Sequence, residues 1–198
     1  MTARTHEGRY ALVLAAGAGR RFGGGKLTAP WAGEPLVRAA VRTALAAPVA
    51  GVIVVTGADA AAVTRALAPL AEPRLSFTHA DGWTEGLGAS LRAGVTALPR
   101  DAAAVVVFLA DMPCIPSSLA GPLLDAVAVA PASVIRSPHG PAHPAAFAAA
   151  LLPCLLALSG DSGARALLRE LGDRVFAIDS DDPGVVFDVD RPEDLASN

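Results

Sequence analysis

The chain has 198 residues, of which 53% are hydrophobic and 5% aromatic, and its formal net charge at pH 7 is −3. A chain of this length can bury a substantial core within one domain. It contains no apolar run of the roughly 18 residues that a membrane span needs, and no basic stripe that would indicate nucleic-acid binding. Two cysteines without metal-ligand spacing, and an N-terminus without a signal-peptide pattern, fit a reducing cytoplasm.

Short apolar runs alternate with segments of helical periodicity along the chain. The runs predicted to form strands are residues 11–15, 52–56, 75–78, 105–110, 133–136, 175–178 and 185–189. The predicted helices are residues 36–47, 60–70, 88–98, 119–129, 146–158 and 163–171. This alternation, with strands that are apolar almost throughout, is typical of a mostly parallel sheet covered on both faces. The sequence therefore predicts one three-layer α/β domain, whose ligands collect beyond the carboxyl ends of the strands.

A glycine-rich loop follows the first predicted strand, in the stretch LVLAAGAGRRFGGGK that spans residues 12–26. Gly17 and Gly19 allow backbone amides to point into a concave anion-binding nest. The loop also carries Arg20, Arg21 and Lys26, whose charges suit a triphosphate. It matches neither a Walker loop nor a full dinucleotide fingerprint, because the later glycines stand at other spacings. We therefore expect the loop to hold a nucleotide triphosphate.

Lys26 is the only lysine among the 16 basic residues of the chain. All the others are arginines, so a position that keeps lysine is expected to need a compact, movable ammonium rather than a planar guanidinium. A surface lysine retained by chance is the alternative interpretation. Its place at the end of the glycine loop favours the first reading.

Asp111 directly follows the strand predicted over residues 105–110. One or two carboxylates together with phosphate oxygens are the usual ligands of Mg²⁺, so Asp111 is the candidate metal ligand. Asp188 and Asp190 lie on one face of the last predicted strand and offer a second ligand. The sequence does not rank the two, because a helix start at residues 191–194 would need one of them as its cap.

Four further loops carry polar residues that a substrate could meet. Residues 56–59 follow the second predicted strand, and Ser90 begins a helix whose first turn is rich in glycine. The stretch SPHGPAHPAAF has two histidines but no third ligand, so we expect a substrate-facing loop or a rigid turn rather than a zinc site. In GDSGARALL a helix begins near residue 161, and Arg165 is placed to meet an anionic substrate.

Taken in order, six segments of the chain resemble the signature segments of MobA-like nucleotidyltransferases. They are LAAGAGRRFGGGKLTAPWAGEPLV, TEGLGASL, LADMP, GPAHPAAF, GDSGARALL and DVDRPEDL. The resemblance is to the molybdenum cofactor cytidylyltransferase branch in particular, and it runs from about residue 10 to residue 195. It implies a Rossmann-like three-layer α/β/α sandwich, with residues 1–9 as a flexible N-terminal segment and residues 10–198 as a single domain. Phe22, Gly19 and Leu87 depart from the usual family residues, but none of these departures removes a charge.

The resemblance also implies an activity and a set of site residues. The activity is a Mg²⁺-dependent transfer of CMP from CTP to the terminal phosphate of molybdopterin, with release of pyrophosphate; a molybdoenzyme would accept the product. Arg21, Lys26 and Asp111 are expected to be catalytic, and Asp111, Asp188 and Asp190 are the candidate metal ligands. The expected nucleotide-binding residues are Leu14, Ala15, Ala16, Gly17, Gly19, Arg21, Lys26, Thr56, Gly86, Gly88, Ser90 and Asp111. The expected pterin-side residues are Pro113, His143, Asp161 and Arg165.

Three other functions remain open at this point. One is the same chemistry with GTP or with another phosphorylated acceptor, although Ala15 and Ala16 before Gly17 resemble the cytidylyl branch. Another is a nicotinamide-dependent oxidoreductase of the nicotine-pigment type, against which the lack of an acidic residue directly at the end of the second strand speaks. The last is a cofactor-carrying chaperone without catalysis. Lys26 and Asp111 together favour a metal-bound triphosphate, and so favour the transferase.

Overall fold

The protein is described by a computed structural model over residues 6–158, 160 and 163–196. A seven-stranded sheet in the order β5-β4-β1-β6-β8-β7-β9 forms its centre. The strands are β1 (Arg9–Ala15), β4 (Gly51–Thr56), β5 (Leu75–His79), β6 (Ala104–Leu109), β7 (Ala132–Ser137), β8 (Gly140–Ala148) and β9 (Val175–Asp179). β8 runs antiparallel to both of its neighbours, and the other pairings in this sheet are parallel. A separate two-stranded hairpin joins β2 (Pro30–Trp31) to β3 (Glu34–Pro35).

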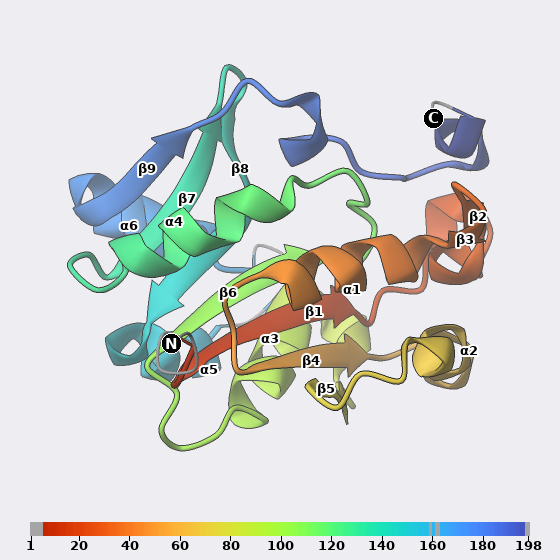
Figure 1. Ribbon diagram of the computed structural model, residues 1–198, viewed down its shortest axis with the longest axis horizontal. Helices are drawn as coiled ribbons and strands as arrows, with labels where there is room; N and C mark the ends of the chain where they lie inside the picture. The colour runs from red at the N-terminus through yellow and green to blue at the C-terminus, as the bar shows by residue number, and fades with distance from the viewer. Residues whose placement is uncertain (1–5, 159, 161–162, 197–198) are drawn as a thin grey trace.

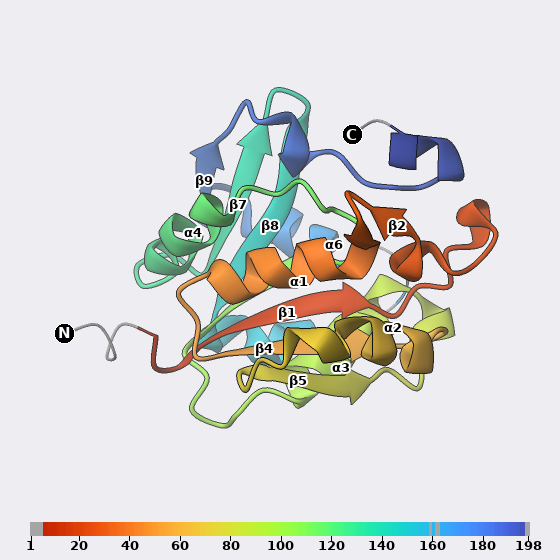
Figure 2. The same ribbon diagram turned by 45° about the vertical axis from the view of Figure 1, so that its right-hand side comes forward.

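Helices cover both faces of the sheet, which confirms the predicted three-layer α/β fold (Figure 1). One face carries α1 (Leu36–Ala46), α2 (Ala60–Leu67) and α4 (Ala120–Ala126), whose apolar residues share a core with β1, β4 and β6. The other face carries α3 (Leu87–Thr96), α5 (Leu152–Leu156) and α6 (Arg165–Leu171). Figure 2 shows the arrowheads of β1 and β5 at one edge of the molecule, towards the β2–β3 hairpin. The loops at that edge are the ones in which the sequence analysis placed the ligand.

Apolar spacing explains why these segments pack as they do. The buried positions of α1 are Leu36, Val37, Ala40, Val41 and Ala44, which recur on one face of a helix. On the opposite face of the sheet, α3 approaches closely because it has Gly94 at the contact. A Cβ atom at Gly94 would lie 2.8 Å from Leu12 Cδ1 and 2.9 Å from Val55 Cγ2. The later part of α3 therefore packs closely on β1 and β4.

Most of the SPHGPAHPAAF stretch is a strand, so its prediction as a loop or rigid turn was wrong except at residues 138–139, which form the turn between β7 and β8. β8 covers residues 140–148 and pairs with β6 and β7, and Ala146 and Phe147 are buried in the sheet. The helix predicted over residues 146–158 is correspondingly shorter: a 3₁₀ turn over Ala149–Leu151 precedes α5. Alanine-rich apolar residues satisfy either periodicity, so the competing strand was missed.

Residues 185–189 do not form the predicted last strand. Pro183–Val185 is a 3₁₀ turn, and the chain then runs without regular structure towards a 3₁₀ helix at Pro192–Ala196. Val185 and Val189 are fully buried in the same core as α1. The apolar residues of 185–189 therefore indicate burial and not pairing with another strand. Within the described residues, none of the helices is both long and apolar enough to cross a lipid bilayer.

Candidate functional site

The glycine loop folds back on itself directly after β1. Gly19 has a φ of 57°, in the left-handed region that favours glycine. Its carbonyl accepts hydrogen bonds from the amides of Phe22 (3.0 Å) and Gly24 (3.2 Å). A Cβ atom at Gly19 would lie only 2.9 Å from Lys26 Cβ, so the loop closes tightly there. Arg20–Phe22 and Lys26–Thr28 are single 3₁₀ turns on either side of this closure, and they bring Arg21 and Lys26 together.

The loop after β4 supports the start of the glycine loop. The amide of Ala58 donates to the Ala16 carbonyl at 3.1 Å. A Cβ atom at Gly57 would lie 2.5 Å from that carbonyl oxygen, so only glycine allows the two loops to approach this closely. Thr56 is buried and its hydroxyl donates to the Thr78 carbonyl at 3.0 Å. The predicted nucleotide-binding Thr56 therefore lies behind the loop and is directed towards β5.

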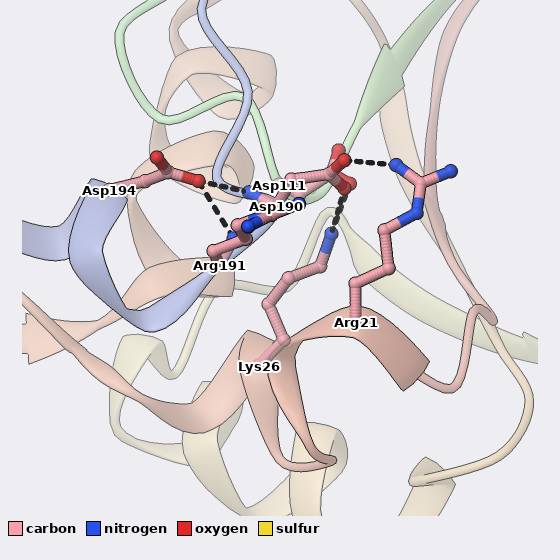
Figure 3. Close-up of polar contacts among 6 residues, drawn as sticks. All are labelled: Arg21, Lys26, Asp111, Asp190, Arg191 and Asp194. Atoms are coloured by element: carbon pink, nitrogen blue, oxygen red, sulfur yellow. Dashed lines mark hydrogen bonds and ion pairs between the residues drawn. The ribbon is translucent and has the colours of Figure 1, made fainter.

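Two cations and two carboxylates from distant parts of the sequence form one cluster (Figure 3). Lys26 Nζ donates to Asp111 Oδ2 at 2.7 Å and lies 3.9 Å from Asp190 Oδ1. Arg21 donates to the other oxygen of Asp190. The Lys26 side chain is only 11% exposed, compared with 74% for Arg21. Lys26 is therefore a largely buried, paired cation at the centre of the cluster, and Arg21 closes it on the solvent side.

Asp190 is held in place by backbone contacts that the sequence analysis missed. Asp194 Oδ2 accepts the backbone amides of Arg191 at 2.7 Å and Asp190 at 2.8 Å. These bonds lower the pKa of Asp194 from its usual value, the Arg191 amide having the larger effect. Asp194 is thus the residue that caps the C-terminal turn, and neither Asp188 nor Asp190 does so with its side chain. The only signal for this in the sequence is the spacing of Asp194 from Arg191.

Asp188 lies close to the same cluster. The amide of Val189 donates to the Asp111 carbonyl at 2.9 Å, which holds residues 188–190 beside the end of β6. Burial raises the pKa of Asp188, and the carboxylates of Asp111 and Asp190 raise it further. Within the described residues, no three His, Cys, Asp or Glu side chains are already arranged to hold a metal ion. Asp111 and Asp190, which share the Lys26 ammonium, are the carboxylates best placed to hold a divalent cation.

A pocket of about 580 Å³ opens over this cluster. Its charged lining residues are Arg20, Arg21, Lys26, Asp111 and Asp190, and its uncharged ones include residues from the glycine loop, the ends of β1 and β6 and the start of α3. The predicted residues that line it are Leu14, Ala16, Gly17, Gly19, Arg21, Lys26, Gly86, Ser90, Asp111 and Asp190. The lining residues not assigned to a ligand beforehand are Ala18, Trp83, Thr84, Leu87 and Leu109, and Arg20 was noted only as a charge. Thr84 begins the stretch TEGLGASL that the sequence analysis quoted and Trp83 directly precedes it, but nothing there singled them out.

Two predicted nucleotide-binding residues, besides Thr56, do not line this pocket in the described part of the chain. Ala15 is buried in the core beneath α1. Gly88 is buried in the first turn of α3, and its amide donates to the Gly160 carbonyl at 3.0 Å.

The predicted pterin-side residues are not gathered around the pocket. Arg165 lines a larger groove of about 1260 Å³ between α6, β7 and β9. His143 on β8 has a pKa lowered to about 4, chiefly by burial and also by the charge of Arg165. Its Nδ1 atom is buried and has no hydrogen-bond partner among the described residues, so the ring is neutral at pH 7. Pro113 does not line either cavity within the described residues, and Asp161 lies outside them.

The smaller pocket, rather than the larger groove, carries the candidate chemistry. The groove is lined by arginines and apolar residues with one carboxylate, Asp173. Of the two, the pocket is the one that combines a glycine-rich backbone, a largely buried ammonium and two carboxylates, beside the carboxyl ends of β1 and β6. This is the arrangement of an α/β protein that binds a phosphorylated nucleotide.

Comparison with known proteins gives the family. Residues 11–175 match the MobA-like NTP transferase domain, and the chain belongs to this family. It is 36% identical to nicotine blue oxidoreductase from Paenarthrobacter nicotinovorans, with 93% of each chain covered. It is 34% identical to the purine catabolism protein PucB from Bacillus subtilis, with 92% of each chain covered.

Solved structures share the fold over nearly the whole chain. Rv0371c from Mycobacterium tuberculosis superposes with a TM-score of 0.84 at 26% identity, covering 96% of both chains. A complex of Rv0371c with manganese gives a TM-score of 0.80 at 25% identity, also covering 96% of both chains. A nucleotidyl transferase from Methanothermobacter thermautotroptrophicus gives a TM-score of 0.82 at 26% identity, covering 96% of this chain and 94% of the other. The resemblance to MobA-like nucleotidyltransferases and the fold class are thus confirmed.

Proposed function

We propose that the protein transfers the CMP group of CTP to the terminal phosphate of a molybdopterin-type substrate and releases pyrophosphate. The observation that carries this proposal is the mixed lining of the pocket. Cationic side chains and the glycine loop form part of the lining, and Trp83, Leu87 and Ser90 form another part. A triphosphate suits the cationic groups and a nucleobase suits the uncharged ones. Ala16 lines the pocket, and its methyl group would favour the smaller pyrimidine base.

The donor set fits a magnesium ion. Asp111 and Asp190 both offer carboxylate oxygens, the ligands that Mg²⁺ prefers, and they already share one cation in Lys26. The complex of Rv0371c with manganese supports a divalent cation in this fold. Asp111 and Asp190 would hold the ion, which would supply positive charge against the charge that develops on the phosphate oxygens. Asp188 is the remaining candidate ligand.

The side chains of the cluster then act by positioning and by charge. An oxygen of the acceptor phosphate attacks the α-phosphorus in line, a new P–O bond forms, and the bond to the departing pyrophosphate breaks. The attacking phosphate is already an anion, so no side chain needs to remove a proton. Lys26 and Arg21 stabilise the negative charge that grows on the leaving group, while the glycine-loop amides hold the triphosphate. The glycine loop is already closed by its own hydrogen bonds, and the Lys26 ammonium needs only a short movement from Asp111 to the phosphate, which limits the reorganisation that catalysis requires.

A reduction that uses NADPH is the second candidate, because nicotine blue oxidoreductase is 36% identical to this chain. Product analysis separates the two reactions. The protein is incubated with CTP, GTP or ATP, with Mg²⁺ and molybdopterin, and released pyrophosphate is measured. In parallel, NADPH oxidation is followed with a quinonoid pigment. Pyrophosphate release that requires both CTP and the acceptor supports the proposal, whereas NADPH oxidation without any pyrophosphate release would reject it.

The cellular setting belongs to the same proposal. A cytoplasmic location is consistent with Cys114 and Cys154, which are free cysteines. The product would pass to a molybdoenzyme. Co-purification of such an enzyme with the tagged protein would test that step separately from catalysis.

A further inference from the structure

Part of the uncharged lining of the pocket forms a wall that is held in place by residues outside the pocket. This wall is the 3₁₀ turn η4 (Trp83–Glu85), which joins β5 to α3 and places Trp83 and Thr84 against the pocket. Thr84 and Glu85 are exposed, and only Trp83 packs against the core. A turn with so little burial of its own needs other contacts to hold one position.

Arg92 provides those contacts from the second turn of α3. Its Nη2 donates to Glu85 Oε2 at 2.8 Å, and its Nη1 donates to the backbone carbonyl of Leu158 just beyond α5. One guanidinium thus joins three segments: the wall turn, α3 and the end of α5. The planar fork of an arginine can satisfy two acceptors in different directions at once, which a lysine cannot do with the same geometry.

Neighbouring backbone contacts also join α3 to residues that follow α5. The Gly88 amide donates to the Gly160 carbonyl at 3.0 Å, and a Cβ atom at Gly163 would lie 2.8 Å from Leu87 Cδ2. These contacts place Gly160 and Gly163 against the first residues of α3, but neither reaches the wall turn. Among the described residues, the ion pair between a side chain of α3 and the turn is Arg92–Glu85, and it adds to the apolar packing of Trp83.

We propose that Arg92 is a positioning residue for nucleotide binding. It holds the Trp83–Glu85 turn in the position, relative to the glycine loop, that binding of the nucleotide requires. This inference rests on the proposed function, because it assumes that a nucleotide occupies the pocket. Arg92 does not itself line the pocket in the described part of the chain, so it acts through Glu85. The affinity for nucleotide should therefore depend on Arg92, and the chemical step should not.

Arg74 offers a matched control elsewhere in the chain. It also bonds a nearby carboxylate, Glu72, and a backbone carbonyl near the end of a helix, that of Leu45. It precedes β5, at the end of the sheet opposite the pocket. Arg74→Ala therefore removes the same kinds of bond without touching the wall turn.

Hydrogen exchange in the nucleotide-free protein tests the support directly. The amides of Glu85 and Gly86 donate to the Gly82 and Trp83 carbonyls within the turn, at 2.9 Å and 3.3 Å. Arg92→Ala should speed exchange at these amides, whereas Arg74→Ala should leave it unchanged. Unchanged exchange in Arg92→Ala would overturn the proposal.

Binding of CTP with Mg²⁺, measured by titration calorimetry, tests the consequence. Arg92→Ala should weaken binding about fivefold, the value of a partly exposed ion pair, and should raise KM with kcat unchanged. Arg92→Lys should recover part of the loss by restoring the pair with Glu85. An equal loss in Arg74→Ala, or full affinity in Arg92→Ala, would overturn the proposal. If the wild-type protein bound no nucleoside triphosphate, the proposed function would fail, and the exchange comparison would still decide whether Arg92 holds the wall.

Discussion

Replacing Lys26 tests the centre of the site most directly. In Lys26→Ala the ammonium that lies 2.7 Å from Asp111 and 3.9 Å from Asp190 is lost. If this ammonium moves to the triphosphate during the reaction, its removal should cost about 3–4 kcal/mol of transition-state stabilisation, as loss of one preorganised donor does. That corresponds to a fall in kcat/KM of roughly two to three orders of magnitude. Steady-state pyrophosphate release with CTP measures it.

The same change has a cost in stability that the sequence did not indicate. An exposed loop lysine would contribute little, but the Lys26 side chain is 11% exposed and pairs with a carboxylate that is 26% exposed. Its removal leaves Asp111, Asp188 and Asp190 close together without their central cation. We expect a loss of about 1–3 kcal/mol in the free energy of unfolding, the usual cost of leaving a partly buried polar partner unsatisfied. Denaturant unfolding without added metal measures this quantity.

Lys26→Arg separates a moving contact from a passive charge. A guanidinium keeps the charge but is wider and planar, so it cannot occupy the same place between phosphate oxygens. We expect Lys26→Arg to retain most of the stability and to lose most of the activity. Full activity in Lys26→Arg would refute the role assigned to Lys26 and would leave Arg21 as the main cationic group of the loop.

Four further predictions follow from the geometry. Asp111→Asn should abolish turnover and leave the circular dichroism spectrum unchanged, because the side chain lies at a strand end; an unfolded variant would show that Asp111 is structural. Mg²⁺ should raise the melting temperature of Lys26→Ala more than that of the wild type, since the ammonium no longer competes for the carboxylates; equal shifts would contradict this competition. Because the pKa of Asp188 is raised in the folded state, its ionisation destabilises the fold as the pH rises from the unfolded to the folded pKa. Asp188→Asn should therefore have a larger free energy of unfolding than the wild type at pH 7 and the same free energy below about pH 3.9. A difference in this free energy that stays constant across the range would contradict the shift. Gly57→Ala should weaken CTP binding in calorimetry and lower the melting temperature, because the new methyl group would lie 2.5 Å from the Ala16 carbonyl; wild-type binding would show that the two loops can separate freely.

The sequence predicted the parallel part of the sheet well because those strands are buried on both faces. β1, β4 and β6 are apolar almost throughout, and no other local structure explains such short runs between loops. β8 was missed because its pairing with β6 and β7 is a long-range contact, and its two prolines and its alanines resemble a turn followed by a helix. Apolar spacing shows that a residue is buried, but it does not show which backbone it pairs with.

The sequence predicted which loops form the site, but it did not predict which side chains form ion pairs there. Each loop that lines the pocket follows a predicted strand, so topology brings Lys26 and Asp111 together although 85 residues separate them in the sequence. The choice between Asp188 and Asp190 depended on a strand that does not form. A strand would have put both side chains on one face, whereas the irregular backbone, capped by Asp194, directs Asp190 to Arg21 and Lys26. Local turn geometry, which period-two spacing cannot describe, decides that assignment.

The pairing of charges within the cluster bears on how a nucleotide enters. In the nucleotide-free structure the cations that should meet a triphosphate are bound to the carboxylates that should meet a metal. Neither set is left as an isolated buried charge, which would cost far more than the pairs do. A metal and a triphosphate that arrive together can replace both ion pairs at once. Asp111 and Asp190 gain the metal as Lys26 and Arg21 move to the phosphates. A triphosphate alone would leave Asp111 without its cation, and a metal alone would leave Lys26 without its anion. Under the proposed function, this pairing of charges favours binding of the metal–nucleotide complex over either component, and the compact ammonium of Lys26 can make the exchange by a small movement.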